Sequence, residues 1–139
     1  MVLVFPAIYA DVYLHPYQYI YYNSLVGGAK GAFRNFELDY WGTSYREAAL
    51  YINQVAPANS TVLVGDPVGV FWDYARPDLH LTSFRDINLN VHYDYVIIDT
   101  QNNFDTTVCQ SIGRIKSITG GGALLTIIKS PPLSVKGCP

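Results

Sequence analysis

Apolar residues recur at helical spacing between Tyr45 and Val55, which predicts an amphipathic helix with one buried face. Pro57 follows this stretch and is expected to close the helix. Ser44 precedes it and is predicted to be the N-cap, with Glu47 three residues later completing a capping box. The capping pattern therefore places the first helical residue at Tyr45.

Three short apolar runs farther along the chain predict β-strands. They cover residues 61–65, 79–84 and 93–99. A short helix is expected from Val68 to Ala75, because Pro67 suits a first helical turn and Pro77 suits an end. Alternating helices and strands predict an α/β fold, a Rossmann-like three-layer sandwich with a mostly parallel sheet.

Two further apolar runs, 114–119 and 123–129, flank a glycine triplet at 120–122. Strand, glycine turn and strand predict a C-terminal antiparallel hairpin that is added to the sheet. The alternative is one longer helix up to Ser117 followed by a single strand. The glycine triplet and the β-branched residues beside it favour the hairpin.

A further helix is expected to begin at Asp105 or Thr106 and to run to about Ile112. It would include Cys109, the first of two cysteines. Cys109 and Cys138 make neither a metal site nor a disulfide framework. We expect Cys109 to be half-buried and Cys138 to lie in the tail. The alternative is a disulfide between the two.

Residues 1–22 are rich in aromatic side chains and carry one charged residue, Asp11. Pro6 and Asp11 interrupt the apolar run, which is shorter than the roughly 20 residues that span a bilayer. Its tyrosines suit the headgroup level of a membrane, where a ring has one dry and one wet end. They are Tyr9, Tyr13, Tyr17, Tyr19, Tyr21 and Tyr22, the first four being the expected contacts. The alternative is a buried first helix or strand with tyrosines on the protein surface.

The composition favours a surface of which one part faces something other than water. Charged residues make up 14% of the 139, well under the roughly 25% of typical soluble domains, and aromatic residues also make up 14%. The net charge of -2 and the lack of a Lys/Arg cluster argue against a nucleic-acid partner. The length predicts one domain with one core.

The segment that joins the aromatic start to the α/β part carries an acidic pair among aromatic residues. The candidate contacts there are Glu37, Asp39, Tyr40 and Trp41. They could bind a sugar hydroxyl or a cation, with the rings stacking on the ligand. In strand geometry residues 37 and 39 would point to one side, and the acidic pair could instead meet Arg34 and Arg46 as a structural latch.

Asp66 and Asp99 follow or end predicted parallel strands, at the edge where open α/β sheets bind ligands. The alternative is that each carboxylate caps the next turn. Three glycine-rich stretches begin at residues 27, 65 and 120, but none has the spacing of a phosphate-binding loop, so we expect conformational roles. The histidines are scattered, so neither a metal site, a cofactor nor a hydrolase triad is expected.

The run from His15 to Ala48 reads HPYQYIYYNSLVGGAKGAFRNFELDYWGTSYREA. Its pattern YNxLVGGxxGAxxxFExDYWGxSYREA resembles the segment after the last transmembrane helix in bacterial and archaeal membrane glycosyltransferases of the dolichyl-phosphate-mannose protein mannosyltransferase-like superfamily. The resemblance covers the first third of the chain. It implies a membrane-proximal segment 1–22 that ends a last transmembrane helix, followed by a motif linker 23–44. The pattern of elements then predicts an α/β domain 45–130, and the end of the chain is expected to be a loose tail 131–139.

The resemblance also implies a function. In that superfamily the catalytic acid lies in the first extracytoplasmic loop, so no catalytic residue is carried over to this chain. The chain is then expected to be a non-catalytic, membrane-associated domain on the extracytoplasmic side, which contacts the transmembrane part and a glycan or protein acceptor. Two alternatives are a free-standing Rossmann-like enzyme that binds a nucleotide or S-adenosylmethionine at Asp66 and Asp99, and an interaction module that docks through residues 1–22.

Overall fold

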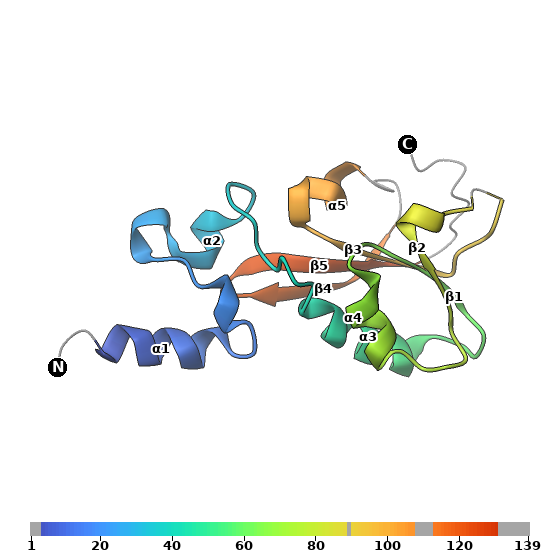
Figure 1. Cartoon of the computed structure of the whole chain (residues 1–139), viewed down its shortest axis with the longest axis horizontal. Helices are drawn as coiled ribbons and strands as arrows, with labels where there is room; N and C mark the ends of the chain where they lie inside the picture. Colours follow the sequence, from blue (N-terminus) through green and yellow to red (C-terminus); the bar gives the residue numbers. More distant parts are fainter. Residues whose placement is uncertain (1–3, 89, 108–112, 131–139) are drawn as a thin grey trace.

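The computed structural model describes residues 4–88, 90–107 and 113–130. Their strands form a five-stranded sheet in the order β2-β1-β3-β5-β4 (Figure 1). The strands are β1 Thr61–Val64, β2 His80–Ser83, β3 Tyr95–Asp99, β4 Arg114–Gly120 and β5 Ala123–Lys129. The α-helices are α1 Val4–Leu14, α2 Gly28–Ala32, α3 Ser44–Val55, α4 Val68–Tyr74 and α5 Phe104–Thr107. Single 3-10 turns are η1 Gln18–Ile20, η2 Ser24–Val26, η3 Phe84–Asp86 and η4 Gln101–Asn103. The chain is therefore an α/β protein.

The sheet is mixed. β1 runs parallel to both of its neighbours, with Leu63 opposite Val96 of β3. β5 lies antiparallel between β3 and β4, with Ile127 opposite Ile98 of β3. The predicted hairpin is confirmed. The prediction of a mostly parallel sheet is wrong, because β5 pairs directly with β3 and two of the four strand pairings in the described sheet are antiparallel.

Both faces of the central strands are buried. Val62 and Val64 of β1 pack in the main core, which also contains Ile52 of α3. Leu63 faces the opposite side and packs with Val96 of β3 in a smaller cluster. Figure 1 shows α3 and α4 on one side of the sheet and α5 on the other. Burial on both faces explains why these strands read as continuous apolar runs instead of alternating ones.

The helices α3 and α4 occupy the stretches that the sequence predicts. The helix expected to reach residue 112 is described only over α5, and the rest of it lies outside the described residues. So do both cysteines, Cys109 and Cys138, and the tail 131–139. Within the described part of the chain, no helix has the length and apolar character needed to cross a membrane.

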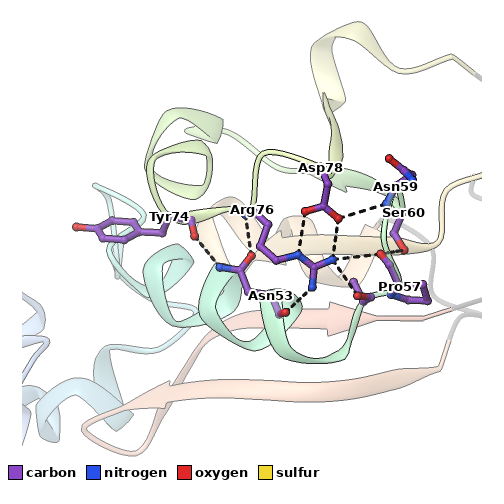
Figure 2. A network of polar contacts seen from close by, with 8 residues as sticks. Asn53, Pro57, Asn59, Ser60, Tyr74, Arg76 and Asp78 are labelled. Atoms are coloured by element: carbon purple, nitrogen blue, oxygen red, sulfur yellow. Dashed lines mark hydrogen bonds and ion pairs between the residues drawn. The ribbon is translucent and has the colours of Figure 1, made fainter.

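The side chain of Arg76 joins the end of α3 to the residues after α4 (Figure 2). Its guanidinium donates hydrogen bonds to the carbonyl oxygens of Asn53, Ala56 and Pro57 at 2.5, 3.0 and 3.3 Å. It also pairs with both carboxylate oxygens of Asp78 at 3.0 Å. The last carbonyls of a helix lack partners within the helix, and a cation complements its dipole there. Arg76 therefore caps the C-terminus of α3.

The segment after α1 packs against the turn of the β4–β5 hairpin. A Cβ added to Gly120 would lie 2.8 Å from Tyr17 Cδ2, and one added to Gly121 would lie 2.7 Å from Leu14 Cδ2. Gly121 also has a φ of +55°, in the left-handed region that favours glycine. The glycine triplet is thus needed both for the turn and for the close approach of the N-terminal segment, as a conformational role predicts.

We expect Gly121→Ala to lower the free energy of unfolding by about 2–3 kcal/mol, because the methyl group adds both steric overlap and left-handed strain. The measurement is urea unfolding followed by circular dichroism. Gly69→Ala is the matched control, since a Cβ at that α4 position meets nothing within 4 Å. The control should be neutral or stabilising by up to about 1 kcal/mol. Equal losses in the two variants would contradict the packing explanation.

Candidate functional site

Candidate residues from distant parts of the sequence meet at one end of the sheet. Asp66 follows β1 and Asp99 ends β3, and these two strands are parallel neighbours. The motif linker 23–44 reaches the same end, where a Cβ on Gly42 would lie 3.0 Å from Pro67 Cγ. The prediction that Asp66 and Asp99 share a sheet edge is confirmed. We call this end, where β1 and β3 finish, the carboxyl edge.

Asp39 is the most deeply buried acidic residue of the motif linker, at 2% exposed. Its carboxylate accepts hydrogen bonds from the backbone N–H groups of Thr43 at 2.7 Å and Ser44 at 3.1 Å. The hydroxyls of Ser44 and Tyr19 donate to it as well. Ser44 also shares a 2.6 Å hydrogen bond with Thr126 of β5. The Asp39 carboxylate thus ties the N-terminal segment, the start of α3 and the sheet together, and we call this group the Asp39 latch.

The Asp39 latch replaces the capping box that the sequence predicts. Ser44 is already the first residue of α3, and no side chain of the N-cap residue Thr43 caps the helix. Glu47 accepts a hydrogen bond from the Tyr17 hydroxyl at 2.9 Å instead of turning back to Ser44. The predicted N-cap is wrong because a carboxylate five residues earlier binds the free N–H groups of the first turn.

A second contact fixes the motif linker, through Arg34. Its guanidinium donates to both carboxylate oxygens of Asp105 at 3.2 and 2.8 Å, and to the side-chain oxygen of Asn103 at 2.6 Å. The Asp105 side chain is 3% exposed. The fork geometry of the guanidinium suits this two-point contact. A latch was predicted for the acidic pair with Arg34 and Arg46, but Arg34 binds Asp105, and Arg46 lies 5.3 Å from the Tyr74 ring centroid.

The other three candidates of the motif linker are exposed. Glu37 lies on the surface beside the buried Asp39, so the two do not share a face as strand geometry would require. The cause is the left-handed backbone of Asp39, whose φ is +54°. Tyr40 and Trp41 form an edge-to-face pair with ring centroids 5.0 Å apart, and Trp41 is 70% exposed. The latch therefore holds an exposed aromatic pair next to the carboxyl edge.

The glycines of the motif linker serve its backbone. Gly27 and Gly28 have φ values of +81° and +65°. A Cβ on Gly31 would lie 1.9 Å from the Val26 carbonyl oxygen, so no other residue fits there. Asn23 accepts hydrogen bonds that cap η2, which fixes the entry to this turn. These contacts agree with the expectation that the glycines are conformational.

Asp66 and Asp99 are held differently at the carboxyl edge. Asp66 pairs with Arg85, whose Nε lies 2.6 Å from Asp66 Oδ2. Asp99 Oδ1 accepts a hydrogen bond from the backbone N–H of Gln101 at 3.3 Å, which is the turn-capping contact that the sequence left open. Asp99 is 5% exposed, and no described residue gives a hydrogen bond to its Oδ2 atom.

The environment of Asp99 changes its acidity. Burial raises the pKa of this carboxyl to about 7, with the Gln101 N–H lowering it and the charges of Asp39, Asp105 and Asp66 raising it. Near neutral pH the carboxyl is therefore divided between its acid and carboxylate forms. Burial and the charge of Asp99 also raise the pKa of Tyr45, whose buried hydroxyl has no partner among the described residues.

Two cavities open at the carboxyl edge. One of about 170 Å³ lies between residues 33–38 of the motif linker and residues 100–103 after β3. The other, of about 210 Å³, is lined by both candidate aspartates and four further residues: Asp66, Phe84, Asp99, Gln101, Asn102 and Phe104. Gln101 and Asn102 line both cavities. The described residues contain no group of three or more His, Cys, Asp or Glu side chains that could hold a metal ion.

Sequence reasoning missed four lining residues: Phe84, Gln101, Asn102 and Phe104. Phe84 and Phe104 come together only because β2 and β3 end at the same edge, and their ring centroids are 5.4 Å apart. The pair Asn102-Asn103 carried a usable signal. Both have a positive φ, and adjacent asparagines after a strand are typical of a turn.

We expect Asp39→Asn to lower the free energy of unfolding by about 2–4 kcal/mol, because it removes a buried carboxylate that accepts several hydrogen bonds. Asparagine tolerates the left-handed backbone, so the substitution isolates the chemical change. Urea unfolding gives the measurement. Glu37→Gln, at an exposed carboxylate of the same linker, should stay within about 0.5 kcal/mol. A comparable loss in Glu37→Gln would argue against the Asp39 latch.

Asp99 should make stability depend on pH. Because its pKa is about 7 in the folded state against 3.8 as the ordinary value, the unfolded chain releases this proton first as pH rises. The wild type therefore loses stability between about pH 4 and 7, relative to Asp99→Asn, by on the order of 2–4 kcal/mol. Urea unfolding of both proteins at about pH 4.5, 6 and 8 measures the difference. A difference that does not change with pH would show that the carboxyl is not perturbed.

Comparisons with models of protein families, with curated proteins and with solved structures give no match to this chain. The features of this chain that bear on its function are therefore the carboxyl edge, the Asp39 latch, α1 and the motif linker.

Proposed function

We propose that this chain is a non-catalytic, extracytoplasmic C-terminal domain of a polyprenyl-phosphate-sugar-dependent membrane glycosyltransferase, accessory to acceptor or partner binding. In this proposal α1 is the end of a last transmembrane helix, and the motif linker joins it to the α/β domain. The sugar-transferring residues belong to the transmembrane part, so no residue of this chain is assigned to catalysis.

The observation that carries the proposal is the exposure of α1. Its 11 residues include one charged side chain, Asp11, and only Leu14 is buried. The large apolar side chains around the helix are exposed: Val4, Phe5, Ile8, Tyr9, Val12 and Tyr13. In Figure 1, α1 extends from the end of the molecule beside the β4–β5 turn. A helix that is apolar all round is usually buried in a core or in a membrane.

The structure of the motif linker supports the same proposal. The Asp39 latch and the pair of Tyr17 with Glu47 bind the chain after α1 firmly to α3. Tyr17 is only 4% exposed, so a membrane contact in this fold would fall to Tyr9, Tyr13 and Tyr19. A firmly held linker is what a domain needs if it must keep a fixed position next to a membrane.

The finer architecture is also part of the proposal. We describe the domain as a Rossmann-like three-layer sandwich, on the ground that β2, β1 and β3 are parallel and that helices lie on both sides of the sheet. In this arrangement the carboxyl edge is the expected ligand edge. An acceptor-binding role would then use the carboxyl edge together with the exposed pair Tyr40 and Trp41.

We expect the full chain to bind phosphatidylcholine–phosphatidylglycerol vesicles through α1. Replacing Phe5, Ile8 and Val12 by serine should weaken vesicle binding at least about 10-fold, because three large apolar side chains no longer enter the lipid. Flotation of vesicles in a density gradient measures the bound fraction. The control replaces two exposed apolar residues outside α1, Val55 at the end of α3 and Ile115 in β4, by serine and should float like the wild type. Equal flotation of the α1 variant would remove the main support for the proposal.

A second candidate is a free-standing Rossmann-like protein that binds a nucleotide or S-adenosylmethionine at Asp66 and Asp99. The observation that favours it is the cavity of about 210 Å³ at the carboxyl edge, the place where such folds hold ligands. Its weakness is the turn after β1, GDPVG, which lacks the glycine spacing that brings a backbone close to a pyrophosphate.

A further inference from the structure

The cavity between Asp66 and Asp99 combines polar and apolar walls. Its residues come from the segments that follow β1, β2 and β3, so three neighbouring strands position it. Phe84 and Phe104 meet edge to face and supply apolar lining. The polar lining comes from Asp66, Asp99, Gln101 and Asn102. A small ligand with one apolar face and one polar edge would match both walls.

Asp99 gives the cavity an unused hydrogen-bonding atom. The side chain is 5% exposed, and its Oδ2 atom has no hydrogen-bond partner among the described residues. A buried polar atom without a partner costs free energy, and native structures leave few of them. The Oδ2 atom itself is closed to solvent, and Asp99 lines the cavity, so a rotation of the side chain that turns this oxygen toward the cavity would let a ligand hydroxyl supply the missing partner.

Asp66 offers a second acceptor beside it. Its Oδ2 atom receives the Arg85 Nε at 2.6 Å, whereas its Oδ1 atom receives only a long hydrogen bond of 3.5 Å from the Ser83 hydroxyl. Asp66 Oδ1 therefore keeps acceptor capacity. Two neighbouring carboxyl groups, each with an oxygen to spare, suit two neighbouring hydroxyl groups.

The charges near the cavity select against anions. Asp66, Asp99 and the nearby Asp105 would repel a phosphate, and the Arg85 side chain is exposed and already paired with Asp66. A cation has little to gain either, because Arg85 compensates Asp66 and the Asp99 carboxyl is partly protonated at neutral pH, its pKa being raised by burial. A partly protonated carboxyl can both donate and accept, as a hydroxyl does. The remaining ligand class is neutral and hydroxylated.

We propose that this cavity binds a neutral sugar ring, whose two adjacent hydroxyl groups hydrogen-bond to Asp99 and Asp66 while the apolar face of the ring lies against Phe104. Two sources carry this chemistry: a hexose of a glycan and the ribose of a nucleoside. The cavity site stands on its own geometry, and only the hexose source rests on the proposed function.

The test is a titration of the full, ¹⁵N-labelled chain followed by NMR. The probes are methyl α-mannopyranoside for the hexose source, adenosine for the ribose source, and trans-cyclohexane-1,2-diol as the bare diol. We expect saturable shifts at Asp66, Phe84 and residues 99–104, with a dissociation constant on the order of 1–10 mM. Shifts with the glycoside alone would identify a glycan as the source, and shifts with adenosine alone would identify a nucleoside.

Variants test the assigned atoms. Asp99→Asn should weaken binding of the responding probe about 10-fold, as expected for one hydrogen bond to a buried carboxyl. Asp66→Asn provides a second variant in case the first one fails to fold. Asp73→Asn, at an exposed carboxylate of α4 that lines neither cavity of the carboxyl edge, is the matched control and should bind like the wild type.

Three results would overturn the proposal. The first is that no probe gives a saturable shift up to ~100 mM. The second is that cyclohexanol or 2′-deoxyadenosine, which lack the diol, binds as tightly as the corresponding diol, and the third is that inorganic phosphate shifts the same residues. None of these results bears on vesicle binding by α1. Failure of the sugar site and failure of the membrane proposal are therefore separate outcomes.

Discussion

The fold depends on one buried carboxylate. Asp39 brings a negative charge to the N-terminus of α3, where the free N–H groups and the positive end of the helix dipole stabilise it. Burying an ion without such partners would cost several kcal/mol by order of magnitude. Because two of its partners are the Tyr19 hydroxyl and Ser44, which itself reaches Thr126, the same charge fixes the N-terminal segment on the sheet. Among the described residues, backbone N–H groups and hydroxyls stabilise the Asp39 carboxylate without an arginine side chain.

A second constraint acts at the turn of the β4–β5 hairpin. The β4–β5 turn must be free of side chains because the chain after α1 passes directly over it. The glycines therefore have two roles in the turn: they allow the left-handed backbone, and they leave space for the side chains of the N-terminal segment. The N-terminal segment is consequently attached at two places, by hydrogen bonds at α3 and by close packing at the turn.

The sequence was informative about the fold and less so about the site. The continuous apolar runs located β1 and β3, and the glycine triplet correctly favoured a hairpin. The capping box failed, because spacing cannot reveal that Asp39 folds back over Ser44. The parallel sheet was overestimated, because nothing in a hairpin pattern says which of its strands pairs with β3. Of the residues that line the cavity, only Asp66 and Asp99 could be predicted. Phe84 and Phe104 meet because of the order of the strands in the sheet, which their spacing in the sequence does not reveal.

The two attachments of the N-terminal segment have a mechanical consequence. A force applied along α1 passes to the folded core directly, because the chain after α1 is held by these contacts. It reaches α3 through the hydroxyls of Tyr17 and Tyr19, and it reaches β4 and β5 through the side chains that cover Gly120 and Gly121. The load is therefore shared between a helix and two strands, so a pull on α1 enters the folded core at two places at once.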